Sequence, residues 1–242
     1  MKSLFVAWQD SVSRQWAPVG RLSHDEGKYR FVYTQGAKSS LFIPFGRMTD
    51  LNAEYVSDEL FPLFANRILA KSRPEYDRYM NWLGLERSSH DAFDELVRTG
   101  GLRATDSLEL FPYPQPTFDD CYQAHFFCRG LRYFDSESQT RAAKLGVDEA
   151  LFLMSDLQNE HDSMALVLRT GDPMTLVGYV PRYFSTEFTE LLRIVGADQV
   201  KVSVKKVNPQ APLQYRLLCR ITAPWPKTFR PCEGGVFQSL AR

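Results

Sequence analysis

Hydrophobic residues in the first third of the chain change from strand-like to helix-like spacing. Ser3–Ala7 and Lys28–Tyr33 are short runs rich in Phe, Val and Tyr, which are residue types enriched in strands. Residues 57–71 instead carry apolar side chains at helical spacing behind two possible capping residues. We therefore expect strands first and then helices over 57–71, 74–84 and 91–99, the last opened by Asp91 and closed by Gly100-Gly101.

The second half of the chain has a different pattern, in which short strand-like segments dominate. The segments are 126–133, 150–154, 165–169, 175–180, 199–207 and 214–222, with one helix expected over 185–195. Many short strands within about 100 residues predict a small barrel or sandwich.

A proline-rich segment separates these two patterns. Phe111-Pro112-Tyr113-Pro114-Gln115-Pro116 has proline at alternate positions, which favours an extended connector. A chain of 242 residues is long enough for two ordinary domains. We predict an α+β protein with a small strand-plus-helix domain at 1–111, a linker at 112–118, a strand-rich domain at 119–226 and a loose tail at 227–242.

Charge is balanced over the whole chain but uneven near its end. Lys plus Arg and Asp plus Glu both number 29, so bulk attraction to a polyanion is not expected. From Arg182 to Arg242 there are ten basic and four acidic residues. In Lys201-Val202-Ser203-Val204-Lys205 the alternation puts both lysines on one strand face. That face is either a solvated surface or part of a groove that follows phosphates.

Several classes of protein are disfavoured by what the sequence lacks. No apolar run reaches the length of a bilayer span, and Gln9 and Asp10 interrupt the short apolar start before a signal peptide is complete. The four cysteines show no CxxC spacing, so we expect reduced thiols in the cytoplasm and no membrane association. P-loop, GxGxxG, GxSxG and HExxH motifs are missing, which disfavours an enzyme and predicts neither cofactor nor metal.

Three segments of the second half place planar or charged side chains at the ends of strands. They are Gly130–Phe134, Leu153–Leu166 and Gly178–Arg182. They supply guanidiniums that neutralise phosphate, rings that stack on bases and hydrogen-bonding groups: Arg132 and Arg182; Tyr133, His161 and Tyr179; Asn159 and Asp162. A carboxylate repels phosphate unless a hydroxyl donates to it, and a terminal sugar hydroxyl is such a donor.

At these segments the sequence resembles the HIRAN domain family, over roughly Ala124 to Ala223. The most specific match is Asn, any residue, an aromatic or His, then Asp, before a small apolar strand at Asn159–Leu166. The Gly178–Arg182 turn follows it. The resemblance implies an OB-like barrel that captures the 3′ end of single-stranded DNA through its free hydroxyl.

The resemblance also implies a role for each matching residue. Tyr133 beside Arg132 would stack on the terminal base, and Asp162 would accept from the 3′-hydroxyl. Asn159 would help to orient the end, Arg182 would contact the backbone, and Tyr179 lies where a His can do so. His161 departs from the Tyr of well-understood members, so end binding is expected to be weaker and more dependent on pH. A duplex-opening wedge is not placed, although Leu213 or Tyr215 is possible.

Other interpretations of the same residues stay open. Tyr133 and Tyr179 are alternatively ordinary rim aromatics of a barrel, and Asp162 is alternatively a turn cap that accepts from local amides. RNA ends and peptides are alternative ligands.

The first half resembles the N-terminal lobe of HipA-type toxin kinases, over about residues 3–110. The resemblance rests on Leu4–Trp8, Val19-Gly20, Tyr29–Tyr33 and Phe61–Leu69. No segment supplies the kinase's catalytic lobe, so phosphoryl transfer is not carried over. The resemblance implies a docking role for the helix around Phe61–Leu69, whose apolar face is alternatively core of its own domain.

Together these patterns predict a non-enzymatic bacterial adaptor in DNA repair. Its second domain would hold a DNA 3′ end while its first domain recruits a helicase or nuclease. The alternative is an interaction module of a toxin-like or phage-defence system, in which the barrel is only a scaffold. A nuclease is disfavoured because no carboxylates cluster near a basic groove.

Overall fold

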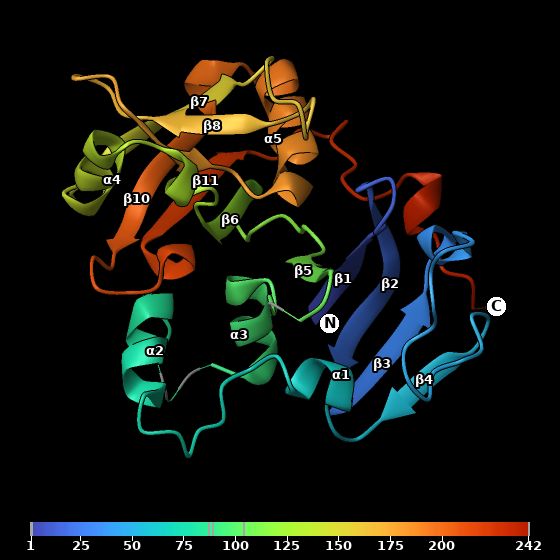
Figure 1. Ribbon diagram of the computed structural model, residues 1–242. Coiled ribbons are helices and arrows are strands. Elements are labelled where there is room, and N and C mark those ends of the chain that lie inside the picture. The colour runs from blue at the N-terminus through green and yellow to red at the C-terminus, as the bar shows by residue number, and fades with distance from the viewer. Residues whose placement is uncertain (1, 87, 89, 104, 242) are drawn as a thin grey trace. The chain divides into compact units, whose positions relative to one another are not determined.

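The computed structural model describes residues 2–86, 88, 90–103 and 105–241. The first residue of the predicted first domain and the last residue of the predicted tail therefore lie outside the described residues. The chain forms two compact units (Figure 1). Unit 1 comprises Met1–Tyr76, Arg87–Pro114 and Arg230–Arg242, and unit 2 comprises Asp77–Glu86 and Gln115–Phe229. The chain enters unit 2 first for Asp77–Glu86 and again within the proline-rich segment, between Pro114 and Gln115.

Unit 1 is built on an antiparallel sheet with the strand order β4-β3-β2-β1-β5. Its strands are β1 (Lys2–Gln9), β2 (Trp16–Asp25), β3 (Lys28–Tyr33), β4 (Glu54–Ser57) and β5 (Leu108–Pro112). Its helical segments are η1 (Gln35–Lys38), α1 (Pro62–Ala65), α3 (Ala92–Thr99) and η5 (Gly235–Phe237). The expected strands at Ser3–Ala7 and Lys28–Tyr33 are confirmed, whereas β2, β4 and β5 were not anticipated.

Helix α3 begins and ends where the sequence predicts. The side chain of Asp91 accepts from the backbone N–H of Asp94, and the Asp94 side chain accepts from that of Asp91, which is a capping box. Gly100 follows the helix with φ at 70°, a conformation that glycine adopts without steric cost.

The predicted helix over 57–71 is wrong. Its first residue ends β4, which pairs with β3, and only Pro62–Ala65 is helical. After this short helix the backbone also bonds to a distant segment, because the N–H of Leu69 donates to the Glu95 carboxylate over 2.9 Å. The buried Arg67 guanidinium is held by the Gly101 carbonyl and the Asp106 carboxylate, which fixes the chain in a non-helical path.

The prediction of a loose C-terminal tail is also wrong for the described residues up to 241. Leu240 N–H donates to the carbonyl of Tyr33 over 2.8 Å, and Ser239 forms a bridge with Thr34. The rings of Phe237 and Phe5 lie 4.9 Å apart. Arg242, which was counted in the basic excess, lies outside the described residues. These contacts make the end of the chain part of unit 1.

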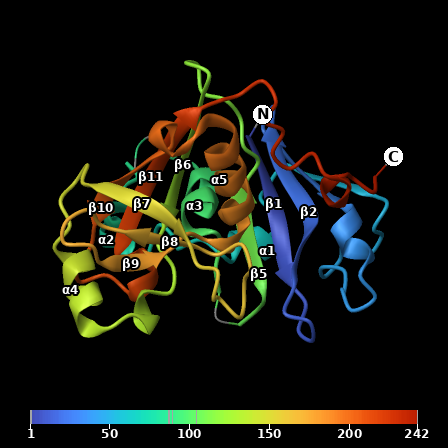
Figure 2. The same ribbon diagram turned by 90° about the horizontal axis from the view of Figure 1, so that it is seen from above.

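Unit 2 is built on a second antiparallel sheet, with the order β6-β11-β10-β7-β8-β9 among the described residues. Its strands are β6 (Cys121–Phe127), β7 (Ala150–Ser155), β8 (Leu166–Arg169), β9 (Leu176–Tyr179), β10 (Lys201–Val207) and β11 (Leu217–Pro224). Arg129, just after β6, forms a bridge with Tyr179 on β9. The two ends of the sheet therefore meet and close it into a barrel, as predicted (Figure 2 views the strands from above).

Helix α5 (Arg182–Val195) covers the core of this barrel. Phe184, Phe188 and Leu191 are buried on one face of the helix. The Phe188 ring lies 5.6 Å from that of Phe126 on β6, and Tyr122 donates its hydroxyl to the buried Glu187 carboxylate over 2.7 Å. This helix confirms the one expected over 185–195 and extends it by one turn toward its N-terminus.

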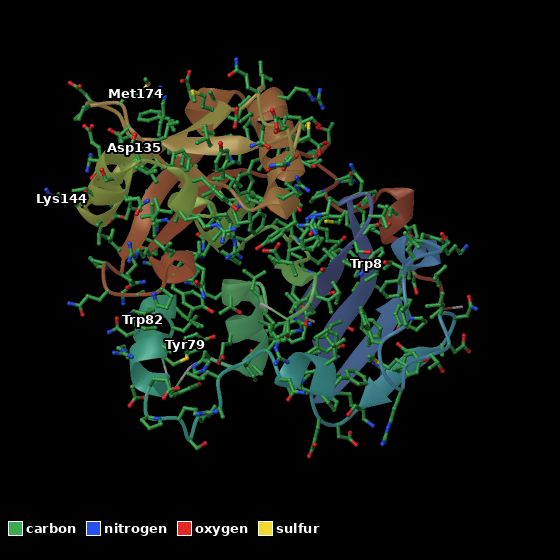
Figure 3. The ribbon with its side chains drawn as sticks, viewed as in Figure 1. Trp8, Tyr79, Trp82, Asp135, Lys144 and Met174 are labelled. Carbon is green, nitrogen blue, oxygen red and sulfur yellow. The ribbon has the colours of Figure 1, made fainter. Side chains whose placement is uncertain are left out.

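Most of helix α2 (Tyr76–Leu83) groups with unit 2. Tyr79 packs on Tyr215 with ring centroids 5.9 Å apart, and the carbonyl of Trp82 accepts from Asn208 over 2.9 Å (Figure 3). The helix expected over 74–84 is thus confirmed. No helix in the described part of the chain is both long and apolar enough to cross a membrane.

One predicted strand of unit 2 is too long, and one helix was not expected. β6 ends at Phe127, and Gly130, with φ at 67°, turns the chain into the short helix η2 (Leu131–Tyr133). α4 (Ser136–Ala143) follows after Asp135, whose side chain accepts from the Ser138 N–H. The remaining short helices of the unit are η3 (Ala197–Gln199) and η4 (Leu213–Tyr215).

Candidate functional site

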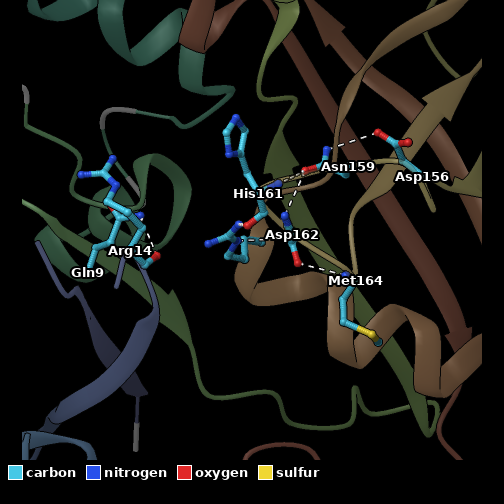
Figure 4. A network of polar contacts seen from close by, with 8 residues as sticks. Gln9, Arg14, Asp156, Asn159, His161, Asp162 and Met164 are labelled. Atoms are coloured by element: carbon cyan, nitrogen blue, oxygen red, sulfur yellow. Dashed lines mark hydrogen bonds and ion pairs between the residues drawn. The ribbon is translucent and has the colours of Figure 1, made fainter. Parts of the chain in front are cut away.

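The loop after β7 is held in shape by its own polar side chains. The carbonyl oxygen of the Asn159 side chain accepts from the backbone N–H groups of His161 and Asp162, both over 3.0 Å. Asp162 Oδ1 accepts from the N–H of Met164 over 3.0 Å (Figure 4). Such local bonds are typical of turns formed by Asn and Asp. The Asn and Asp of the motif therefore shape this loop.

Asp162 is also paired with a cation from another element. Arg182, the first residue of α5, donates from Nε to Asp162 Oδ2 over 3.0 Å. The Asp162 side chain is 18% exposed and the Arg182 side chain is 32% exposed. Arg182 also donates to the backbone carbonyl of His161, whose side chain is exposed. The carboxylate is thus partly neutralised and oriented, and each of its oxygens still has a lone pair for a further donor.

A second carboxylate, Asp156, connects this loop to β9. Its Oδ2 accepts from the Tyr179 hydroxyl over 2.8 Å and from the Asn159 amide over 3.2 Å. These hydrogen bonds, that of Tyr179 first, hold the pKa of Asp156 below its usual value. Burial and the nearby Asp156 carboxylate raise the pKa of Tyr179. Asp156 was not among the predicted site residues, although its position directly after a strand and close to Asn159 was a usable signal.

Tyr133 presents the most open ring of the site. The residue is 71% exposed, and the Arg132 guanidinium lies 4.6 Å from the centroid of its ring and donates to its hydroxyl. A Cβ on Gly130 would lie 3.0 Å from Tyr179 and 3.5 Å from Tyr133, so the two tyrosine rings flank this glycine. Tyr179 also packs on Phe134, with centroids 5.4 Å apart.

The structure links five of the predicted site residues through hydrogen bonds and an ion pair. They are Asn159, His161, Asp162, Tyr179 and Arg182, and Asp156 joins Tyr179 to the others. Arg132 and Tyr133 form a separate pair, whose tyrosine ring borders Gly130 as the Tyr179 ring does. Lys201 and Lys205 are exposed on β10, although a bulge between Val204 and Lys206 interrupts the alternation that was expected to put both lysines on one face. The contacts given for the described residues do not join them to this group.

The two residues considered as a duplex-opening wedge occupy packed positions. Leu213 packs against the core of unit 2. Tyr215 lies against both Tyr79 and Phe127, with ring centroids 5.9 and 5.4 Å away. Neither has the exposed position of Tyr133.

Two solved structures are similar to part of this chain. A crystal structure of a protein from Lactobacillus plantarum is 21% identical, with a TM-score of 0.31, over 42% of this chain and 98% of that one. The crystal structure of the HIRAN domain of human HLTF is 16% identical, with a TM-score of 0.32, over 43% of this chain and 74% of that one. No curated protein matches the chain.

A protein-family model provides the assignment of the barrel. The model described as the HIRAN domain matches residues 122–225, which run from the second residue of β6 to just beyond β11. This match confirms the resemblance expected from the motifs at Asn159–Leu166 and Gly178–Arg182. We therefore identify residues 122–225 of this chain as a HIRAN domain.

Proposed function

We propose that this HIRAN domain binds the 3′ end of single-stranded DNA and that the protein acts as an adaptor. HIRAN domains are DNA-binding modules. The observation that carries the proposal is the ion pair between Arg182 and the Asp162 carboxylate, within a hydrogen-bonded network that reaches Tyr179. The exposed Tyr133 ring with its Arg132 guanidinium borders the same glycine, Gly130, as the Tyr179 ring. These groups come from three separate segments of the chain.

The tyrosine of η2 provides the stacking element. With 71% of Tyr133 exposed, a terminal base has room to stack on its ring, an interaction worth about 1–3 kcal/mol per base. The Arg132 guanidinium lies over one face of the ring, so the base stacks on the other face and the guanidinium binds a neighbouring phosphate. This combination is sequence-tolerant because every base has a π-face.

Asp162 provides the preference for a hydroxyl at the end. An ionised carboxylate only accepts hydrogen bonds, so it favours a 3′-hydroxyl and repels a 3′-phosphate. Arg182 lowers the repulsion that the neighbouring phosphodiester would otherwise meet. In the competing interpretation, Asp162 only holds its own loop in shape through local hydrogen bonds. That interpretation predicts the same loop geometry but no preference for either end group.

Fluorescence anisotropy with matched oligonucleotides ending in a 3′-hydroxyl or a 3′-phosphate tests this proposal. We expect tighter binding of the hydroxyl end and an affinity that falls as salt rises. Equal affinity for the two ends would overturn end recognition, and no binding of either would overturn DNA binding. An end-labelled substrate incubated with divalent metal should remain uncut, since the proposed role is binding.

We further propose that unit 1 docks a partner protein, such as a helicase or nuclease. A mostly apolar cavity of about 910 Å³ in this unit supports the proposal. Phe61 and Leu63 line it, while Phe64 between them is fully buried in the core. The other lining residues are Pro44, Phe45, Gly46, Arg47, Met48, Tyr55, Pro62 and Asn66. A cavity of this kind fits a large apolar side chain from a partner.

Substitution in the full chain separates docking from DNA binding. Leu63→Lys is expected to abolish capture of the partner and to leave binding of the 3′ end unchanged. Asp162→Asn is expected to do the reverse. If Asp162→Asn and Tyr133→Ala leave all cellular activity unchanged, the barrel is a scaffold and the alternative of an interaction module holds.

A further inference from the structure

A second aromatic ring on the barrel surface repeats the arrangement of Tyr133. Phe152 on β7 is 44% exposed, and the Arg169 guanidinium from β8 lies 4.7 Å from the centroid of its ring. The corresponding distance from Arg132 to Tyr133 is 4.6 Å. Both pairs thus combine an exposed ring for stacking with a cation for phosphate.

Strand register places this second pair on the same face of the sheet as Tyr179. Tyr179 pairs with Val167, and Val167 pairs with Met154. Residues opposite one another on adjacent strands point to the same face, and so do residues two apart on one strand. Phe152 therefore shares its face with Met154 and Tyr179, two strand spacings or about 10 Å across the sheet from Tyr179.

A lysine lies opposite Phe152 on β10, the strand on the other side of β7. Val202 on β10 pairs with Leu151 on β7, and the antiparallel register continued by one residue puts Lys201 opposite Phe152. Arg169 is directly opposite Phe152 on β8. Phe152 is therefore flanked across the sheet by a cation on each neighbouring strand, and Lys201 is exposed.

From this arrangement we propose a second contact surface for DNA on the outer face of β10, β7 and β8. A base upstream of the terminal nucleotide stacks on Phe152, and Arg169 and Lys201 bind the adjoining phosphates. This inference rests on the proposed function, because it extends the same strand from the Tyr133 end of the site. Single-stranded DNA fits better than an apolar peptide because the exposed aromatic lies between two cations.

The inference also gives a role to Lys201 and Lys205, the predicted site residues on β10. Lys205 is exposed at a bulge of β10 between Val204 and Lys206. Arg220 on β11 extends the face that carries Lys201, although its charge is partly offset by Asp148 at 3.4 Å. The positive charge of this face is therefore concentrated next to Phe152.

Oligothymidylates of two lengths with a 3′-hydroxyl, about 3 and about 12 nucleotides, separate the two surfaces. We expect the wild-type protein to bind the longer one about tenfold more tightly, because it gains a stacked base and phosphate contacts. Phe152→Ala should remove most of this gain and leave the affinity for the short one unchanged, whereas Phe152→Trp should retain the gain. Lys201→Ala and Arg169→Ala should each reduce the salt dependence of the affinity for the longer oligonucleotide.

The control is Phe118→Ala, which removes an exposed phenylalanine from the turn before β6 and should leave both affinities unchanged. Thermal unfolding confirms that each variant is folded. The second surface is overturned if the wild-type protein binds both lengths equally, or if tighter binding of the longer oligonucleotide survives Phe152→Ala. In either case, discrimination between end groups on the short oligonucleotide still supports end capture. Loss of that discrimination with a length gain that depends on Phe152 overturns end capture alone. An equal loss for both lengths in Phe152→Ala would place Phe152 in the end site and overturn a separate surface.

Discussion

Arg182 donates from Nε to Asp162 Oδ2 over 3.0 Å and so ties the first residue of α5 to the loop after β7. The pairing fixes the direction of the carboxylate and lies at the N-terminal end of a helix, where the macrodipole favours negative charge. A negatively charged group is thereby stabilised within a site that otherwise offers rings and cations. Within the loop, the Asn159 and Asp162 side chains accept from local amides, and the Tyr179 hydroxyl donates to Asp156 from β9.

Replacement of Asp162 by Asn should remove the preference for a free 3′ end. A hydrogen bond to a charged group is worth about 1.5–3 kcal/mol, so we expect discrimination between 3′-hydroxyl and 3′-phosphate to fall by at least about tenfold. Anisotropy titration of both oligonucleotides measures it. Glu160→Gln makes the same change of charge at an exposed position of the same loop, and it should leave the discrimination intact.

Removal of the Tyr179 hydroxyl should change how stability depends on pH. The hydrogen bond from Tyr179 lowers the pKa of Asp156, so its stabilising contribution is present above the unfolded pKa of about 3.9 and is lost as pH falls through the lower folded value. We expect Tyr179→Phe to be less stable than wild type at neutral pH and the difference to narrow in acid. Urea unfolding across this pH range measures both quantities, and a difference that widens in acid would contradict the assignment.

Replacement of Gly130 by Ala should both strain the backbone and crowd the tyrosines. A Cβ there meets the Tyr179 ring at 3.0 Å, and φ is 67°. Gly27→Ala is the matched control, because that glycine also has a positive φ of 76° but nothing within 4 Å of its added Cβ. The backbone cost alone is about 1 kcal/mol. We expect Gly130→Ala to be the more destabilising of the two and the only one to weaken binding of the 3′ end.

The four cysteines should divide into two classes of reactivity toward a thiol reagent. Cys128 and Cys219 are buried, with their sulfurs 3.5 Å apart, and burial raises the pKa of the Cys219 thiol. Cys121 and Cys232 are partly exposed. Because the thiolate is the reactive form, we expect the exposed pair to react in the folded protein and the buried pair only in denaturant. A Cys121→Ser, Cys232→Ser double variant that reacts readily without denaturant would contradict this.

The strands and helices that sequence analysis located correctly have patterns that can be satisfied locally. The alternation in β10 and the capping of α3 by Asp91 are examples. The segment at 57–71 was misassigned because its helical spacing competes with pairing between β3 and β4 and with the bond from Leu69 to Glu95. Neither partner is near in sequence. Helix α4 was missed because its residues, SESQTRAA, have little apolar periodicity.

The candidate site was more accessible to prediction than the surroundings that support it. Apart from the two lysines of β10, each predicted residue lies at the end of a strand, in a turn or at the start of α5. The bridge between Arg129 and Tyr179 brings the ends of β6 and β9 together. Asp156 was overlooked because its role depends on the Tyr179 hydroxyl, which belongs to a strand more than twenty residues away. The Phe152 pair with Arg169 was likewise hidden, since it requires the register of β7 and β8.

The bridge between Ser239 and Thr34 has a consequence for how the protein is made. In the order of synthesis, most of unit 2 lies between two parts of unit 1, because Gln115–Phe229 follows Pro114 and precedes Arg230. The HIRAN domain therefore emerges whole before unit 1 receives its closing segment. A chain released after residue 229 would contain every strand of the barrel, attached to an N-terminal sheet that lacks its last contacts.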